Sequence, residues 1–149
     1  GLDMALTCDF RFAAAEAKFR CAYTWVGFNP DAGGSWLMPR LMGLEAAKRF
    51  AFTGDIWSAE KAQVHGLVTE VHAAEELEAA TMAFARELGE GPTVAIRQTK
   101  RLMEDAADRT MAEQLKWEQE AGKICGATED HKEALAAAVE KRNPVFKGR

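Results

Sequence analysis

A carboxylate stands at a sharp break in the chain, within the run G-F-N-P-D-A-G-G at 27–34. Pro30 fixes its own φ and biases Asn29 away from the helical region, so the backbone must turn here. The two glycines that follow allow close backbone approach, and a helix is expected to begin after them. Beside the free amides of a new helix, Asp31 is well placed for chemistry. It is equally suited to cap that helix. Local sequence leaves both interpretations open.

Short helices and strands are expected around this turn. Apolar spacing and alternation predict a helix at 1–8, strands at 10–13 and 18–21, an extended run at 21–28, helices starting after Gly34, at 44–52 and at 58–65, and a strand at 67–71. Ser58 is the expected N-cap of its helix, and Gly66 is its expected stop. These elements form a small α/β part covering 1–71.

The rest of the chain, 72–149, predicts helices alone. Amphipathic segments at 74–88, 93–107, 110–124 and 128–141 are followed by a basic tail at 144–149. Four such helices with few strands to cover them need a partner surface, and exposed apolar helix faces commonly mark an oligomer interface. The sequence therefore predicts a helical oligomerisation region after the α/β part.

Composition disfavours several kinds of partner. The chain has 149 residues, of which 48% are hydrophobic and 28% charged, and its net charge is −4. This acidic balance makes nucleic acid and anionic membrane surfaces unexpected partners. No apolar run approaches the length of a membrane span. The three cysteines form no CxxC pair, which argues against a disulfide framework and a metal site and favours a cytoplasmic setting. A start at Gly-Leu-Asp, without an initiator methionine, suggests a fragment.

Several motifs occur in an order that resembles one known family. They are G-L-D-M-A-L-T-C-D at 1–9, A-K-F at 17–19, G-F-N-P-D-A-G-G-S-W-L-M-P-R-L-M-G at 27–43, T-G-D-I-W-S-A-E-K-A at 53–62 and G-L-V at 66–68. Together they resemble the second half of the enoyl-CoA hydratase/isomerase (crotonase) family. The resemblance implies an α/β fold, the second half of a crotonase-like ββα spiral, followed by the helical region.

The resemblance also implies a chemistry. The substrate would be an acyl-CoA thioester whose carbonyl is polarised by two backbone N–H groups, which stabilise an enolate. Coenzyme A is then part of the substrate, and no separate cofactor is expected. One of the two donors would precede Gly1, so a missing N-terminal half is expected to complete the site. Family members assemble as trimers or as hexamers, and a homotrimer or hexamer is expected here.

Three positions bear on the type of reaction. Asp3 stands where the resembling hydratases have their first glutamate, and Tyr23 stands where they have the second. Asp31 stands where they have glycine and where the resembling isomerases have their proton-shuttling base. Hydratases of the family grip one water with two carboxylates, so this pattern favours an isomerase. Asp31 and Asp3 are the predicted catalytic residues, although Asp3 is also a favourable residue for a first helical turn. Hydration and a non-catalytic scaffold are the alternatives.

Other residues are predicted to bind substrate through the same resemblance. Tyr23 would line the acyl pocket, unless it is a strand tyrosine satisfied locally. Trp25 would shape the pocket, unless it and Trp36 pack in the core. The remaining candidates are Gly33 and Gly34 at the turn, and Phe146 and Lys147, which resemble C-terminal residues that reach the adenine and phosphate end of coenzyme A. The alternative for the last two is a frayed basic tail.

Overall fold

The computed structural model describes residues 1–149, which form two compact units, Gly1–Thr81 and Met82–Arg149. The sequence predicted two parts that meet at 71–72, and the units of the structure meet within helix α5 (Leu77–Gly89). None of the helices combines the length and the apolar composition that a membrane-spanning helix needs.

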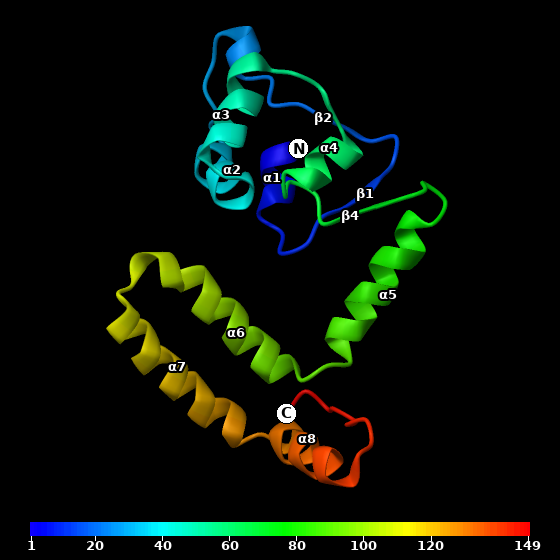
Figure 1. The fold of residues 1–149 in the computed structure, drawn as a ribbon, viewed down its shortest axis with the longest axis vertical. Coiled ribbons are helices and arrows are strands. Elements are labelled where there is room, and N and C mark those ends of the chain that lie inside the picture. The colour runs from blue at the N-terminus through cyan, green and yellow to red at the C-terminus, as the bar shows by residue number, and fades with distance from the viewer. The chain divides into compact units, whose positions relative to one another are not determined.

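The first unit contains the short helices α1 to α4, which Figure 1 shows, and two pairs of short strands. Its elements are α1 (Leu2–Leu6), β1 (Phe12–Ala14), β2 (Lys18–Phe19), the 3-10 helix η1 (Thr24–Val26), α2 (Gly34–Met42), α3 (Leu44–Thr53), β3 (Trp57–Ser58), α4 (Ala59–Val64), β4 (Glu70–His72) and the start of α5. Strand β1 pairs with β4 in parallel, with Ala13 opposite Val71. Strand β2 pairs with β3 antiparallel, with Phe19 opposite Trp57. These pairings confirm the mixed α/β character of this part.

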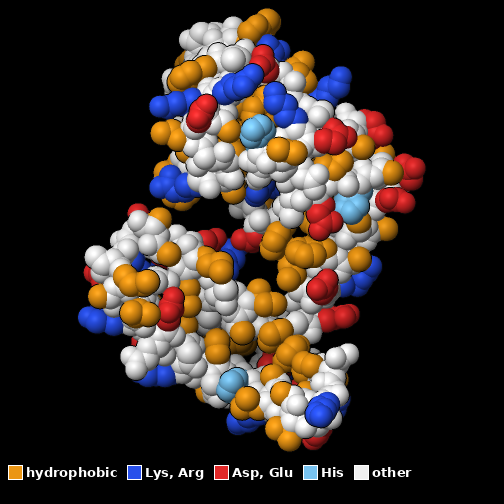
Figure 2. All heavy atoms as spheres, in the orientation of Figure 1, with side chains coloured by type: hydrophobic (Ala, Val, Ile, Leu, Met, Phe, Trp, Pro, Cys, Tyr) orange, Lys and Arg blue, Asp and Glu red, His pale blue; other side chains and the backbone are white.

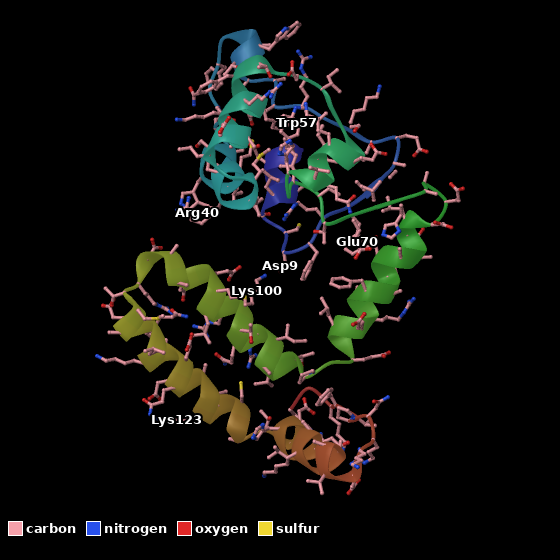
Figure 3. All side chains as sticks on the ribbon, in the orientation of Figure 1. Asp9, Arg40, Trp57, Glu70, Lys100 and Lys123 are labelled. Atoms are coloured by element: carbon pink, nitrogen blue, oxygen red, sulfur yellow. The ribbon has the colours of Figure 1, made fainter.

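The core of the first unit is built around an aromatic pair. Trp57 and Phe50 are the largest fully buried side chains, and their ring centroids lie 4.5 Å apart. Met38 of α2 and Leu67 are buried in the same cluster. Figure 3 shows Trp57 among the elements of this unit. Such tilted aromatic contacts stabilise the core beyond the burial of the rings. The cluster also supports α2, which begins directly after the turn that contains Asp31.

The prediction of an extended run at 21–28 is wrong. After Cys21 the chain forms η1, and Gly27 closes it with φ at 72°. The N–H groups of Val26 and Phe28 both donate to the Tyr23 carbonyl, at 3.1 and 2.8 Å. The aromatic and β-branched composition suggested a strand, but such residues are common in strands mainly because of packing with neighbours. Here the Thr24 hydroxyl donates instead to the carbonyl of Ala51 in α3.

The second unit contains the end of α5, α6 (Thr93–Asp105), the 3-10 helix η2 (Ala106–Asp108), α7 (Met111–Gly126), α8 (Glu129–Glu140) and the C-terminal tail. The predicted helices are confirmed, and two of them, α7 and α8, begin at residues whose side chains cap the helix. Thr110 and Glu113 form a capping box at the start of α7. Thr128 caps α8 by accepting from the N–H of His131 at 3.0 Å.

These helices leave much apolar surface uncovered by the chain. Orange side chains are scattered over the second unit in Figure 2. The exposed large hydrophobic residues of α6, α7 and α8 are Ile96, Met103, Met111, Leu115, Trp117, Ile124, Leu135 and Val139. The predicted oligomer interface stays a prediction.

Candidate active site

The acidic turn leads into α2 without using its carboxylate as a cap. The helix begins at Gly34, and its N-cap is Gly33, at φ 90°, with no side-chain hydrogen bond. The capping interpretation of Asp31 is therefore wrong, because a glycine occupies the position that an aspartate would need. Asp31 is exposed on this chain. Its carboxylate is thus available for a role other than holding the helix.

Asp3 occupies a different environment, although it lies next to the same turn. It belongs to the first turn of α1 and is only 3% exposed. Its Oδ2 accepts a hydrogen bond from the Tyr23 hydroxyl at 3.0 Å, while its buried Oδ1 has no hydrogen-bond partner. The carboxylate packs against Gly34, where an added Cβ would lie only 2.5 Å from Oδ1. Only glycine at this position leaves room for the carboxylate.

Tyr23 joins the two acidic residues. Its hydrogen bond to Asp3, together with desolvation and the nearby Asp31 carboxylate, raises the pKa of Tyr23 to about 12. The hydroxyl therefore keeps its proton at neutral pH. A phenol that is protonated throughout the physiological range does not act as a base. Asp3 and Asp31 thus both interact with the hydroxyl group of Tyr23, whose side chain is half-buried.

A cavity of about 290 Å³ opens beside this group. Its lining residues belong to the start of the chain with α1, to the segment after β2, and to η1 with its N-cap: Gly1, Leu2, Asp3, Arg20, Cys21, Ala22, Tyr23 and Val26. Burial, and next the negative charge of Asp3, raises the pKa of the Cys21 thiol. Since the thiolate is the reactive form, Cys21 is unsuited to act as a nucleophile.

The two tryptophans near the turn are not core residues, so the core-packing interpretation is wrong. Trp25 is 68% exposed and Trp36 is 53% exposed. The Arg20 guanidinium lies 4.5 Å from the Trp25 ring centroid, and the Arg40 guanidinium lies 3.6 Å from that of Trp36. Figure 3 shows Arg40 on α2. The sequence reasoning missed these cation–π pairs, although the four-residue spacing of Trp36 and Arg40 on one helix could have indicated one of them. Substrate contact by Trp25 or Gly33 stays a prediction.

The C-terminal tail is held to α8 by its backbone. Asp130, only 3% exposed, accepts from the N–H groups of Lys147 and Gly148 at 2.7 and 2.9 Å. The N–H of Val145 donates to Glu133 at 2.9 Å. These bonds contradict the frayed-tail interpretation. Sequence reasoning assigned the acidic first turn of α8 only to the helix dipole and missed this anchoring role.

Phe146 is half-buried by this arrangement. It lines a cavity of about 150 Å³ together with residues of α6, α7 and α8 and their flanking loops. The hydrogen bond of Glu133 to Arg142, and then that to the N–H of Val145, lowers the pKa of Glu133 to about 2. The tail therefore presents Phe146 and Lys147 from a fixed backbone. Their contact with coenzyme A stays a prediction.

Known proteins resemble this chain in sequence over its whole length. A family model described as enoyl-CoA hydratase/isomerase matches residues 1–149. The chain belongs to this family. The 1,2-epoxyphenylacetyl-CoA isomerase of Escherichia coli is 34% identical over 149 residues, which make up 100% of this chain and 57% of that protein. The crotonyl-CoA hydratase of Syntrophomonas wolfei is 34% identical over 98% of this chain and 56% of its own length.

Solved structures of the enoyl-CoA hydratase/isomerase family show the same fold. The crystal structure of an enoyl-CoA hydratase from Bacillus anthracis matches with a TM-score of 0.93 and 33% identity, over 100% of this chain and 58% of that one. This confirms the crotonase-like fold predicted from the motifs. The chain spans somewhat more than half the length of these relatives. Because the relatives include both hydratases and isomerases, family membership alone leaves the type of reaction open.

Proposed function

We propose that the full-length protein is an enoyl-CoA isomerase that shifts a carbon–carbon double bond by proton transfer through a thioester enolate. One observation carries the choice. Asp31 is the exposed carboxylate at the turn, and the side chain that interacts with it is the neutral Tyr23 hydroxyl. Asp3, the other carboxylate, is buried with Oδ2 bonded to Tyr23 and Oδ1 packed against Gly34. A single accessible carboxylate suits proton shuttling better than it suits gripping water.

Asp31 would be the general base in this reaction. It would take a proton from the acyl carbon adjacent to the double bond, so that a C–H bond breaks and an O–H bond forms on the carboxyl. The electron pair released would delocalise into the thioester carbonyl as an enolate, which backbone N–H donors stabilise. Return of the same proton to a different carbon would complete the shift. Coenzyme A is part of the substrate, and the proposed steps use no separate cofactor.

Substrate contacts are proposed for residues of each unit taken by itself. Tyr23 and Trp25 would contact the acyl group near the cavity, and Gly33 would allow the substrate to approach the turn closely. Phe146 and Lys147, on the anchored tail, would contact the nucleotide end of coenzyme A. An aromatic ring and an ammonium group suit an adenine and a phosphate respectively.

Hydration of a 2-enoyl-CoA is the second candidate. It is supported by the retained carboxylate at Asp3 and by the relative named as a crotonyl-CoA hydratase. The two reactions can be separated with the full-length protein. A 3-enoyl-CoA should be converted to a conjugated 2-enoyl-CoA, with a gain of enoyl-thioester absorbance, while crotonyl-CoA should lose that absorbance slowly or not at all. Rapid hydration of crotonyl-CoA with no isomerisation would overturn the proposal.

A further inference from the structure

We propose that Tyr23 is a positioning residue whose hydroxyl oxygen accepts a hydrogen bond from Asp31 while Asp31 carries the substrate's proton, and that Asp3 orients the hydroxyl for this purpose. The inference rests on the proposed function and goes beyond it, because it assigns a role to a residue that replaces a hydratase carboxylate. It concerns what happens to the proton between its removal and its return.

Asp3 determines where the hydroxyl hydrogen of Tyr23 points. The bond from the hydroxyl to Oδ2 is 3.0 Å long, and the carboxylate is 3% exposed. Contact with Gly34 in the first turn of α2 leaves this carboxylate no space to move towards the helix. A hydroxyl has one donor and two acceptor positions. With its hydrogen committed to Asp3, Tyr23 can offer only its acceptor positions to a second neighbour.

Asp31 is the candidate for that second neighbour, because it lies three residues before Gly34, which packs against Asp3, and because its carboxylate contributes to the raised pKa of Tyr23. The hydrogen-bonding capacity of Asp31 changes during the reaction. The ionised carboxylate has no hydrogen to donate, whereas the carboxyl that has accepted the substrate's proton becomes a donor. The Tyr23 hydroxyl stays neutral, so its oxygen can accept a hydrogen bond from the protonated Asp31 carboxyl, and no proton needs to move between the two side chains. Asp31 is exposed on this chain, so water is the competing acceptor. A fixed phenolic acceptor would keep the proton on Asp31 long enough for it to return to the substrate.

The arrangement makes a testable statement about isotope exchange. When the full-length protein converts a 3-enoyl-CoA in heavy water, most of the product should carry the original proton at the new position. In the Tyr23→Phe variant, the fraction of product containing deuterium should rise about two- to tenfold, the effect expected from losing one hydrogen bond. Asp3→Ala should change the exchange in the same direction, since the freed hydroxyl hydrogen would turn towards the ionised Asp31.

Thr24→Val is the matched control. It removes the neighbouring hydroxyl, whose hydrogen bond to the Ala51 carbonyl is structural. This variant should lose thermal stability and keep the isotope exchange of the wild type, which separates positioning from general loosening of η1. Mass spectrometry of the product gives the deuterium fraction, and the melting temperature of each variant reports on folding.

The possible outcomes distinguish the two proposals. If the wild-type protein isomerises the substrate and Tyr23→Phe and Asp3→Ala leave the deuterium fraction unchanged, the inference is wrong and the proposed function stands. Complete exchange with solvent in the wild type would also overturn the inference alone. A protein that does not isomerise any 3-enoyl-CoA would overturn the proposed function and this inference with it.

Discussion

Replacing Gly34 by alanine should disturb the group formed by Asp3 and Tyr23 without touching Asp31. The added methyl would lie 2.5 Å from Oδ1 of Asp3 and 2.8 Å from both Cγ and Oδ2. Overpacking of this kind typically costs about 1–3 kcal/mol, whereas alanine gains about 0.5–1 kcal/mol over glycine within a helix. Since Asp3 is buried and has little room to rotate, we expect a net destabilisation of about 1 kcal/mol.

The assay is denaturant unfolding of the full-length protein, followed by isomerase kinetics on the same samples. Displacement of Asp3 should break its bond with Tyr23 and lower kcat, with a smaller change in KM. Gly122→Ala is the control, since a Cβ there meets nothing within 4 Å. That helical substitution should be neutral or stabilising. A Gly34→Ala variant that is as stable and as active as the wild type would refute the packing argument.

Three further predictions concern pH, the tail and assembly. Because the pKa of Tyr23 is raised from 10.0 to about 12, the protonated hydroxyl should contribute fully to stability below pH 10, and this contribution should be lost as the pH rises towards 12. In alkaline unfolding curves, Asp3→Asn should shift that loss to lower pH, because the hydrogen bond to Asp3 is the largest cause of the raised pKa. Asp130→Ala should cost about 1–3 kcal/mol by leaving the part-buried N–H groups of Lys147 and Gly148 without their acceptor, and it should speed proteolysis of the tail. Equal cleavage rates of the variant and the wild type would contradict this. Sedimentation of the full-length protein should give a trimer or hexamer at micromolar concentration, because the apolar faces of α6 to α8 are uncovered, and a monomer would refute it.

Local signals in the sequence predicted most elements correctly. The N-cap at Ser58 is confirmed, since its side chain accepts from the N–H of Lys61, and the helix at Leu44–Thr53 lies where the apolar spacing at 44–52 indicated. These features depend on neighbouring residues, so a pattern in the sequence suffices to find them. The family motifs identified the fold because several of them occur in the family's order, and the structural comparison confirms it.

Contacts between distant parts of the chain account for features that the sequence did not reveal. The 3-10 helix at 24–26 depends on the bond from Thr24 to α3, which no local pattern reveals. The tight contact of Gly34 with Asp3 joins residues far apart in sequence, so no local pattern reveals it, and substrate contact by Gly34 stays a prediction. Asp31 looked like a possible cap because aspartate often is one, yet Gly33 takes the N-cap position in the left-handed region.

The most direct test of the central proposal is the activity of the Asp31→Asn variant of the full-length protein on a 3-enoyl-CoA, measured together with its melting temperature. Asparagine keeps the size of the side chain but is a poor proton acceptor, and loss of a general base typically lowers the rate by about 10²–10⁴-fold. The melting temperature should stay unchanged, because Asp31 is exposed and does not cap α2. Isomerase activity within a few-fold of the wild type, in a variant that folds normally, would contradict the proposed role of Asp31.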